Sequence, residues 1–393
     1  MTPAARLQAA IDILDAVAEA ARHGGAAADT LFQRYFQTRR YAGSGDRRAV
    51  RELTYAAIRS VGELPASGRA AMIAHARAND PTLLALFGAG GHGPGALIDG
   101  EPEGVVADAP AWLAPHFSPA FGADAVMTEI AALLSRAPLD IRVNTLKADR
   151  LVVVEDLPGF TPTPFSPWGL RGENIVLDAH PLARSGAIEV QDEGSQLVAF
   201  ACAARPGMLV VDLCAGAGGK TLALAAMMAN QGHIVACDTD RGRLAELPRR
   251  AARAGVTIAE TRLLYTPDEA AQLEDLTGRA DVVLIDAPCS GTGTWRRNPE
   301  ARWRLTPERL AKLETAQDRL LALGSTLVAP GGRLVYAVCS VLLSEGPACI
   351  AAYHAAHPGW TDLQLPPPIP PMPLSPHRTR TDGFFIAALA PTC

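Results

Sequence analysis

The sequence predicts an α/β protein: a doubly wound, mostly parallel sheet in the C-terminal half, a small α/β module before it and a helical N-terminal region. Three observations support this fold class. From about residue 196 onward, short apolar runs alternate with amphipathic helical stretches. Within residues 1–90, apolar side chains such as Leu7, Ile11 and Leu14 recur at three- and four-residue spacing, which indicates helices. Residues 88–104 are rich in Gly and Pro and interrupt the helical pattern.

A chain of 393 residues is long enough for two or three domains. We expect a helical domain over 1–90, a Gly- and Pro-rich linker over 91–105, a small α/β module over 106–190 and a catalytic domain over 191–393. In the small module, the pattern predicts a helix around 123–135 and strands at 140–146, 151–157 and 174–179.

The C-terminal domain is predicted to contain strands at 209–213, 233–238, 281–287, 332–338 and 384–389. Its helices are predicted to end at Met228 and to cover 241–254 and 307–328. A proline-rich loop at 365–380 is stiff enough to project the residues at its tip, which are His377, Arg378 and Arg380.

Composition narrows the class of protein. With 48% hydrophobic and 20% charged residues, the chain has ample material for a core. It contains no apolar run of about 18 residues and no basic-then-apolar leader, so neither a membrane span nor a signal peptide is expected. The seven cysteines are odd in number and form no CxxC pair, which argues against a disulfide framework and against a zinc site. Reduced thiols predict a cytoplasmic location.

The charge pattern leaves two interpretations open. A net charge of −5 does not favour nucleic acid as a partner. The basic residues are nearly all arginine, and a local cluster is either a phosphate-contacting face or an ordinary solvated helix surface. The cluster consists of Arg39, Arg40, Arg47, Arg48 and Arg51.

A glycine-rich turn follows the first predicted strand of the C-terminal domain, in the segment DLCAGAGGKT. Gly216, Gly218 and Gly219 allow a tight turn and a close backbone approach to a ligand where a helix begins. Asp238 ends the next strand, where a carboxylate can accept both hydroxyls of a ribose. The unit fits a dinucleotide or S-adenosylmethionine; the alternative is a cluster of helix-terminating glycines with a surface aspartate.

Two cysteines stand at the ends of predicted parallel strands, Cys289 after IDAP and Cys339 after LVYAV. Because the carboxyl ends of such strands face the active site in open α/β sheets, both thiols are candidates for covalent chemistry. A thiolate that adds to carbon 6 of a pyrimidine makes carbon 5 nucleophilic enough to accept a methyl group, and a second thiol can assist release. Asp286 precedes Cys289 and either binds a ligand or caps a turn. Cys202, Cys237 and Cys349 are expected to be core residues, and Cys214 is expected to contribute mainly its backbone to the glycine turn.

These motifs resemble the Sun/Nop family of RNA cytosine-5 methyltransferases, in particular the bacterial Fmu/RsmB type. The resemblance rests on DLCAGAGGKT, DAPCSGTGTWRRNPEARW, GGRLVYAVCSVLLSEG and TDGFFIAAL, in this order, with QDEGSQL preceding them. It is close over residues 190–393. The stretch PLDIRVNTLK is similar to the small RNA-binding-like module of the family, and residues 1–90 resemble its helical NusB-like domain more weakly.

The resemblance implies a class I S-adenosylmethionine methyltransferase fold with a seven-stranded Rossmann-like sheet, acting as a monomer on RNA, with ribosomal RNA favoured. It implies that Cys339 is the nucleophile and Cys289 aids product release, and it implies no metal. The positions that it assigns to the S-adenosyl-L-methionine cofactor are Cys214, Ala215, Gly216, Ala217, Gly218, Gly219, Lys220, Asp238, Arg243 and Asp286.

The sequence departs from the family pattern at three positions. Val338 stands where a threonine usually precedes the nucleophile, and Ala217 replaces a frequent proline. Leu264 stands where an acidic residue is expected to contact the adenine ring. Asp268 or Glu260 would need a shift in register to take that role.

Two other functions compete with this interpretation. An amino-group methyltransferase usually carries Asn/Asp-Pro-Pro-aromatic at the strand end that here holds Cys289, and the pair of cysteines counts against it. A non-catalytic RNA-binding or ribosome-assembly factor on a methyltransferase fold would be favoured by loss of the glycine turn or of the nucleophile. Both are present.

Overall fold

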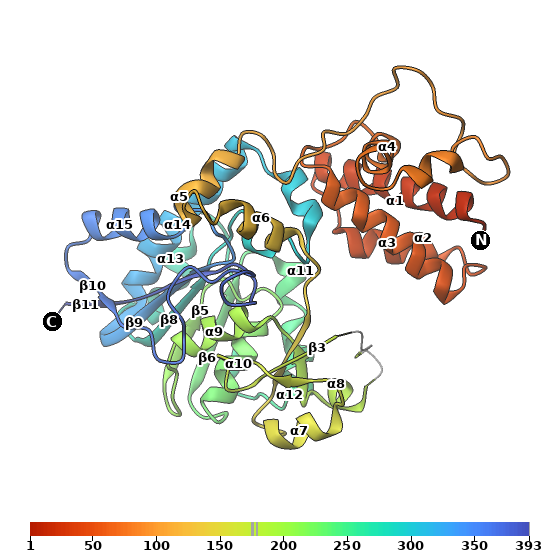
Figure 1. The fold of residues 1–393 in the computed structure, drawn as a ribbon. Helices are drawn as coiled ribbons and strands as arrows, with labels where there is room; N and C mark the ends of the chain where they lie inside the picture. Colours follow the sequence, from red (N-terminus) through yellow and green to blue (C-terminus); the bar gives the residue numbers. More distant parts are fainter. Residues whose placement is uncertain (174–176, 178–179, 393) are drawn as a thin grey trace. The chain divides into compact units, whose positions relative to one another are not determined.

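The computed structural model describes residues 1–173, 177 and 180–392. The described residues form two compact units (Figure 1). The first contains Met1–Arg136 and Thr294–Arg309, and the second contains Ala137–Gly293 and Leu310–Cys393. The domain boundaries predicted at residues 90, 105 and 190 stay a prediction, because the division by compactness falls at other positions.

The first unit is helical. Its main helices are α1 (Pro3–His23), α2 (Ala28–Gln37), α3 (Ser44–Ser60) and α4 (Gly68–Asn79), followed by η1 (Pro81–Leu86). The predicted apolar stripe of α1 is the buried face, since Leu7, Ile11 and Leu14 are almost fully buried. Thr2 caps the start of α1 by accepting from the amide of Ala5.

A segment from far along the sequence completes this helical core. In η5 (Pro299–Arg304), the indole of Trp303 packs among the helices and donates to the carbonyl of Val61 at 2.8 Å. The guanidinium of Arg302 donates to the carbonyls of Ile58 and Arg59 at the end of α3. Residues 299–304 therefore belong structurally with α1–α4, although they lie between two strands of the catalytic sheet in sequence.

The rest of the first unit contains η2 (Ala114–His116), α5 (Phe117–Phe121) and α6 (Val126–Leu134), which confirms the helix predicted around 123–135. In the described residues, no single helix is long and apolar enough to cross a membrane. A sharply bent pair, Ala114–Phe121 with Val126–Leu134, meets the length and composition criteria together.

The second unit begins with a small antiparallel sheet in the order β2-β3-β1-β4. Its strands are β1 (Leu139–Val143), β2 (Thr161–Pro162), β3 (Gly169–Gly172) and β4 (Ile188–Val190), with α8 (Pro181–Ser185) between the last two. The strand predicted at 140–146 is observed as β1. The strand predicted at 174–179 falls largely outside the described residues.

The strand predicted at 151–157 is wrong, because this segment is the helix α7 (Arg150–Asp156). Asp149 accepts a hydrogen bond from the amide of Leu151 and so begins a helix. Of the three consecutive valines that suggested a strand, Val153 is buried while Val152 is exposed. Burial on one side with a capped start favours a helix over the strand propensity of valine.

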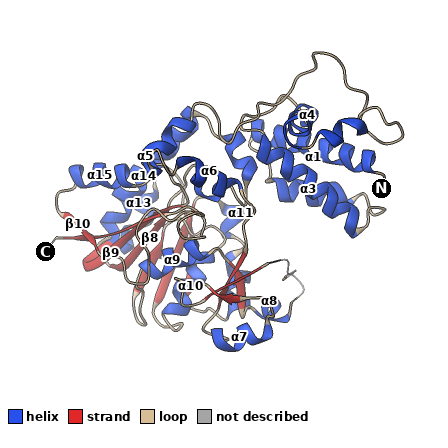
Figure 2. Ribbon diagram, in the orientation of Figure 1, coloured by secondary structure: helices blue, strands red, loops and turns tan. Residues whose placement is uncertain are grey.

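The described residues of the second unit also form a sheet of seven strands in the order β10-β11-β9-β8-β5-β6-β7 (Figure 2). The five strands from β9 to β7 are parallel, and β11 is antiparallel to both of its neighbours, β9 and β10, so β10 runs in the same direction as the five. The mostly parallel doubly wound sheet is confirmed. The strands are β5 (Leu209–Asp212), β6 (His233–Asp238), β7 (Ala259–Leu263), β8 (Ala280–Asp286), β9 (Val328–Val338), β10 (Trp360–Leu363) and β11 (Phe385–Pro391).

Helices cover both faces of this sheet. One face buries Val210 and Leu284 under α9 (Glu193–Ala201), α10 (Gly219–Met227) and α12 (Leu247–Ala254). The other buries Val211 and Ile285 under α13 (Glu269–Gln272), α14 (Pro307–Leu327) and α15 (Pro347–Ala356). The single helix predicted over 241–254 is instead two, α11 (Arg241–Leu244) and α12, with Pro248 in the first turn of the second.

Candidate active site

Two cysteine thiols meet at the carboxyl edge of the seven-stranded sheet. Cys289 lies just beyond β8, and Cys339 directly follows β9. These strands are parallel neighbours whose register pairs Asp286 with Ala337, so both segments leave the sheet side by side. The two sulfur atoms lie 3.4 Å apart, within hydrogen-bonding distance. The structure thus brings together the two thiols that the sequence singled out.

The surroundings decide which thiol keeps its proton. The pKa of Cys289 is raised well above its usual value by its hydrogen bond to Cys339 and by desolvation, with further contributions from the charges of Cys339 and Glu345. Cys289 therefore remains an S–H donor at neutral pH. A protonated Cys289 can donate to the sulfur of Cys339, which suits Cys339 as the nucleophile of the pair.

A partly buried ion pair lies at the same edge of the sheet. Lys220, in the first turn of α10, donates to the carboxylate of Asp286 at 2.5 Å. Desolvation opposes the charge of Lys220, but the pKa of its ammonium is nevertheless raised because Asp286, Cys339 and Asp212 favour the cation. The interaction between this ammonium and Cys339 puts a cation close to the candidate nucleophile.

The predicted glycine turn joins β5 to α10. Gly216 and Gly218 have φ angles of 55° and 86°, in the left-handed region that favours glycine. A Cβ at Gly218 would come within 2.6 Å of Leu247, and one at Gly216 within 2.5 Å of the guanidinium of Arg243. We call residues 214–220 the cradle. Arg243 thus lies against the cradle, and its role in binding the cofactor stays a prediction.

Asp238 fixes the cradle from the neighbouring strand. Its carboxylate accepts from the amide of Gly216 and from the amide of Asp240, both at 2.7 Å. The amide of Ala215 donates to the carbonyl of Cys237, and the carbonyl of Ala217 accepts from Arg250. The thiol of Cys214 packs in the core, so this residue contributes mainly its backbone.

The cradle fits S-adenosylmethionine as a ligand. A carboxylate has about four acceptor positions, so Asp238 can accept from two amides and still bind ribose hydroxyls. Asp212, at the end of β5, has a fully buried Oδ1 without a hydrogen-bond partner among the described residues, while its Oδ2 accepts from Thr221. A ligand that carries hydroxyl and amino groups needs acceptors for its hydrogen atoms and room to approach the backbone closely. The unpaired oxygen of Asp212 and the glycine turn offer both at one strand end.

The structure shows what occupies the positions that depart from the family pattern. Leu264 is buried in the core, and its amide donates to the carbonyl of Asp238. Glu260 contacts Arg262 and His233 instead, and Asp268 is exposed at the start of α13. Neither carboxylate takes the place of Leu264. Val338 is fully buried among apolar side chains, so its position contributes packing and no hydroxyl.

Several residues of the site were not predicted from the sequence. Ser290, Thr292, Ser340, Gln317 and Glu345 are buried beneath the two thiols and hydrogen-bond to one another. A serine follows each cysteine directly, which is the one pattern that could have indicated a shared network. Asp212 belongs to the quoted motif, but the resemblance assigned it no role.

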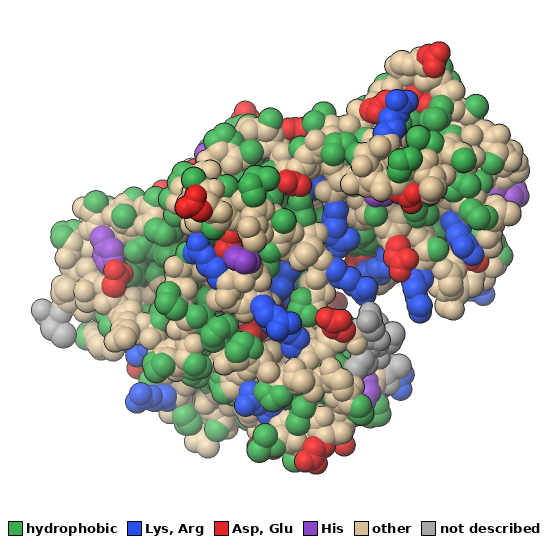
Figure 3. Space-filling view, viewed as in Figure 1, with side chains coloured by type: hydrophobic (Ala, Val, Ile, Leu, Met, Phe, Trp, Pro, Cys, Tyr) green, Lys and Arg blue, Asp and Glu red, His purple; other side chains and the backbone are tan. Residues whose placement is uncertain are grey.

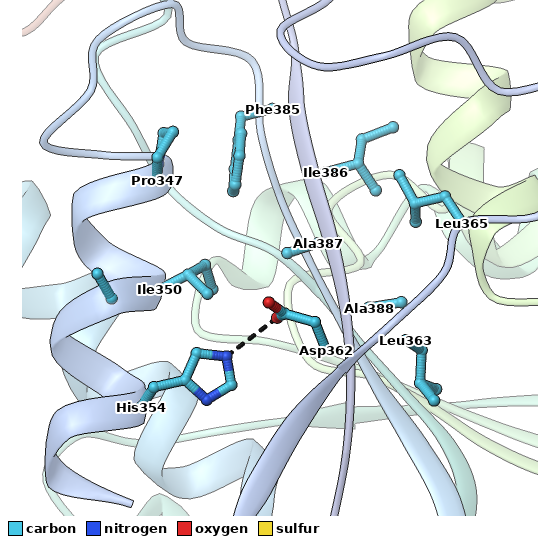
Figure 4. A pocket seen from close by; sticks show the side chains of 11 residues that line it. Pro347, Ile350, His354, Asp362, Leu363, Leu365, Phe385, Ile386, Ala387 and Ala388 are labelled. Carbon is cyan, nitrogen blue, oxygen red and sulfur yellow. Dashed lines mark hydrogen bonds and ion pairs between the residues drawn. The ribbon is translucent and has the colours of Figure 1, made fainter.

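Other predicted features lie outside the thiol pair. His377, Arg378 and Arg380 are exposed on the proline-rich loop, as expected. A pocket of about 380 Å³ lies between α15 and the strands β10 and β11 (Figure 4). His354 and Asp362 form a hydrogen bond in its wall. Because this pocket is lined by neither cysteine and by no cradle residue, it is distinct from the candidate active site.

The arginine cluster lies in the first unit, with Arg39 and Arg40 in the loop after α2 and Arg47, Arg48 and Arg51 on α3. Basic side chains gather over this part of the surface (Figure 3). The guanidinium of Arg39 lies 3.7 Å from the ring centre of Tyr35, and those of Arg47 and Arg51 lie over Phe36 and Phe32. Such stacking orients the charges without neutralising them.

Comparisons with known proteins place this chain in a family. Residues 199–390 match the family model described as 16S rRNA methyltransferase RsmB/F. Ribosomal RNA small subunit methyltransferase B of Sodalis glossinidius is 31% identical over 308 residues, which cover 75% of this chain and 69% of the relative. The chain belongs to the RsmB/F family. The resemblance drawn from the motifs is confirmed.

Further relatives carry related names. A probable ribosomal RNA small subunit methyltransferase B of Synechocystis is 34% identical, covering 71% of this chain and 66% of the relative. A mouse protein named 28S rRNA (cytosine-C(5))-methyltransferase is 32% identical, covering 64% of this chain and 62% of the relative. The chain thus spans about two thirds of the length of these curated relatives.

Solved structures support the fold of this RsmB/F family member over its whole length. The crystal structure of PH0851 aligns with a TM-score of 0.79 at 25% identity and covers 99% of both chains. The structure of NSun6 from Pyrococcus horikoshii, solved with SFG, aligns with a TM-score of 0.65 at 19% identity, covering 72% of this chain and 98% of that chain. The second likeness shows the fold alone.

Proposed function

We propose that this RsmB/F family member is an S-adenosylmethionine-dependent methyltransferase that forms 5-methylcytosine in ribosomal RNA, with Cys339 as the covalent nucleophile. The observation that carries the proposal is the 3.4 Å contact between the sulfur atoms of Cys339 and Cys289 at the carboxyl edge of the sheet. The name of the mouse relative, a 28S rRNA (cytosine-C(5))-methyltransferase, supports the choice of base and atom.

The first step is attack by the Cys339 thiolate on carbon 6 of cytosine. The ammonium of Lys220 is a cation close to the attacking sulfur. Bond formation at carbon 6 moves the ring electrons to carbon 5, which becomes nucleophilic. Asp286 and Lys220 stand at this edge to orient the polar groups of the base.

When bound, S-adenosylmethionine supplies the methyl group as an electrophilic sulfonium. We propose that residues of the cradle bind it, with the Asp238 carboxylate accepting from the ribose hydroxyls and the backbone of residues 214–219 lying against it. After methylation, solvent water takes the proton from carbon 5, the electrons of that C–H bond form the double bond between carbons 5 and 6, and the bond between carbon 6 and Cys339 breaks with its electron pair returning to sulfur. Cys289, held beside that sulfur, assists this release.

The proposal extends to partners and location. RNA is the partner, and the chain acts as a monomer in the cytoplasm; the cysteines found as free thiols fit a reducing compartment. The arginine cluster on α3 and in the loop before it offers phosphate contacts for the RNA. Light scattering behind a sizing column tests the oligomeric state.

The function is tested by incubating the purified protein with methyl-labelled cofactor and ribosomal RNA from cells that lack this gene. Cys339→Ala should abolish methyl transfer, because it removes the proposed nucleophile. Cys289→Ala should leave attack possible but slow release, and should accumulate a covalent protein–RNA adduct on denaturing gels. Methyl transfer by Cys339→Ala at the wild-type rate would refute the proposed mechanism. RNA binding without methyl transfer by the wild type would favour a non-catalytic assembly factor.

A further inference from the structure

A buried hydrogen-bond network connects the two segments that carry the thiols. The hydroxyl of Ser290 lies 3.2 Å from that of Ser340, and Thr292 lies 3.0 Å from Ser340. Thr292 also accepts from the amide of Val341 at 3.1 Å. Because Ser290 follows Cys289 and Ser340 follows Cys339, these bonds fix the two cysteine backbones relative to each other.

Glu345 anchors this network from the loop before α15. Its side chain is fully buried. One carboxylate oxygen accepts from the amide of Ser290 at 2.7 Å and from Gln317 at 3.0 Å, and the other accepts from the hydroxyl of Ser290 at 2.5 Å. Each of these partners is neutral, so hydrogen bonds rather than an ion pair hold the carboxylate. Short bonds to an ionised acceptor are the strong ones in proteins.

The segment 288–290 is held from two sides. Gln317, on α14, donates both to Glu345 and to the carbonyl of Pro288 at 2.9 Å. The hydroxyl of Tyr336 donates to the carbonyl of Glu345 and fixes the backbone of the anchor itself. Cys289 therefore lies between two clamped neighbours, and its freedom to leave Cys339 depends on Glu345.

We propose that Glu345 is a positioning residue that, through Ser290, holds the Cys289 thiol against Cys339 and so controls release of the methylated base. The inference rests on the proposed function and adds that Glu345 affects release of the methylated base and leaves the attack of Cys339 on cytosine largely unaffected. Burying a carboxylate without a cation is costly. The carboxylate of Glu345 also contributes to the raised pKa of Cys289. Cys289 therefore keeps its proton, and its S–H can donate to the departing Cys339 sulfur.

The effect on release follows from what each sulfur does. During attack, the reacting group is Cys339, which has Lys220 as a cation close by. During release, the bond between carbon 6 and sulfur breaks and negative charge returns to Cys339, where the Cys289 S–H can donate to it. If Cys289 is displaced, the attack of Cys339 still has Lys220 close by, but the release step loses the S–H that donates to the departing sulfur.

The test compares Glu345→Gln and Ser290→Ala with the wild type in two assays. On ordinary ribosomal RNA, both variants should accumulate covalent adduct, and Glu345→Gln should turn over roughly tenfold more slowly, the effect of losing one charge-assisted hydrogen bond. On RNA carrying 5-fluorocytidine, release is blocked for every protein because carbon 5 has no proton to lose. Adduct formation there should stay within about twofold of wild type, since attack is unaffected.

Controls separate this role from general destabilisation. Glu269→Gln makes the same change at another buried carboxylate of the second unit, which contacts Thr266 and Arg319, and should leave the adduct level unchanged. In the Cys289→Ala background, Glu345→Gln should add no further slowing, because both act through one thiol. If Glu345→Gln fails to fold, Ser290→Ala carries the test.

The outcomes are distinguishable. Equal losses of adduct formation and turnover in Glu345→Gln or Ser290→Ala, or unchanged turnover in both, would overturn the positioning role. Additive effects of Glu345→Gln and Cys289→Ala would overturn it as well. Failure of the wild type itself to form an adduct with 5-fluorocytidine RNA would instead overturn the proposed function on which the inference rests.

Discussion

The thiol pair and the cradle lie at the same edge of one sheet but are held by different means. Side-chain hydrogen bonds position the thiols, through Ser290, Ser340 and Glu345. Backbone geometry positions the cradle, through positive φ angles at Gly216 and Gly218 and amides that donate to Asp238 and its neighbours. We therefore expect the thiol pair to be sensitive to the loss of polar groups and the cradle to be sensitive to added volume.

The largest effect is expected from added volume at Gly218. Gly218→Ala forces a left-handed residue and places a Cβ 2.6 Å from Leu247, which should cost about 2 to 5 kcal/mol and weaken cofactor binding by more than about tenfold. Calorimetric titration with S-adenosylmethionine and urea unfolding measure both. Gly207→Ala is the matched control, because its φ is 89° but no atom lies within 4 Å of the added Cβ. Equal losses of stability and of cofactor affinity in the two variants would show that backbone strain, and not the contact with Leu247, causes the effect.

A second prediction concerns Asp212, which interacts with charges of both regions. Burial raises the pKa of Asp212 to about 7; the nearby Asp286 and Asp238 add to the rise, and Thr221 and Lys220 oppose it. The unfolded chain gives up this proton near pH 4 and the folded chain only near pH 7, so stability falls as pH rises through that range. Asp212→Asn should therefore stabilise the ligand-free protein by up to about 4 kcal/mol at pH 8 and by little at pH 4.

Chemical denaturation at the two pH values measures this difference. A stability gain for Asp212→Asn that is the same at pH 4 and pH 8 would contradict the raised pKa. If the cofactor uses the unpaired oxygen of Asp212, the same variant should also bind S-adenosylmethionine more weakly than wild type.

A smaller effect is expected where a side chain reaches the backbone of the cradle. Arg250 donates to the carbonyl of Ala217 at 2.7 Å and to the buried carboxylate of Glu189 on β4 at 2.9 Å. Arg250→Ala should destabilise the protein by about 1 to 2 kcal/mol, because Glu189 keeps Arg253 as a partner but loses one charged bond. Its neighbour Arg249 is 81% exposed in a surface pair, so Arg249→Ala should stay within about 0.5 kcal/mol of wild type. The midpoints of urea unfolding curves compare the stabilities of the two variants.

Much of this arrangement was predictable because it depends on local pattern. The run HIVACD predicts β6 to the residue, and the strand-end rule brings Cys289 and Cys339 to one edge before any distance is known. The rest depends on tertiary burial. WTDL, the edge strand β10, has no alternation to indicate a strand, and its burial is only partial.

Glu345 illustrates the same limit within the site. In sequence it is an acidic residue in a loop, a position usually exposed to solvent. Only the packing of α14 and the loop before α15 shows that it is buried under Ser290. Contacts between distant segments decide which polar residues a fold buries, and the local periodicity of the sequence does not indicate them.

The packing of Trp303 among the N-terminal helices has a consequence for biosynthesis. The helical unit buries a tryptophan that is encoded more than 150 residues after the end of α6. Domains generally fold as they emerge from the ribosome, N-terminal first. Here the earliest-made helices wait for translation to pass Arg309 before their core is complete, and by then β5–β8 have already been synthesised. The core of the first-made helices is therefore completed only after most of the strands of the second unit have been synthesised.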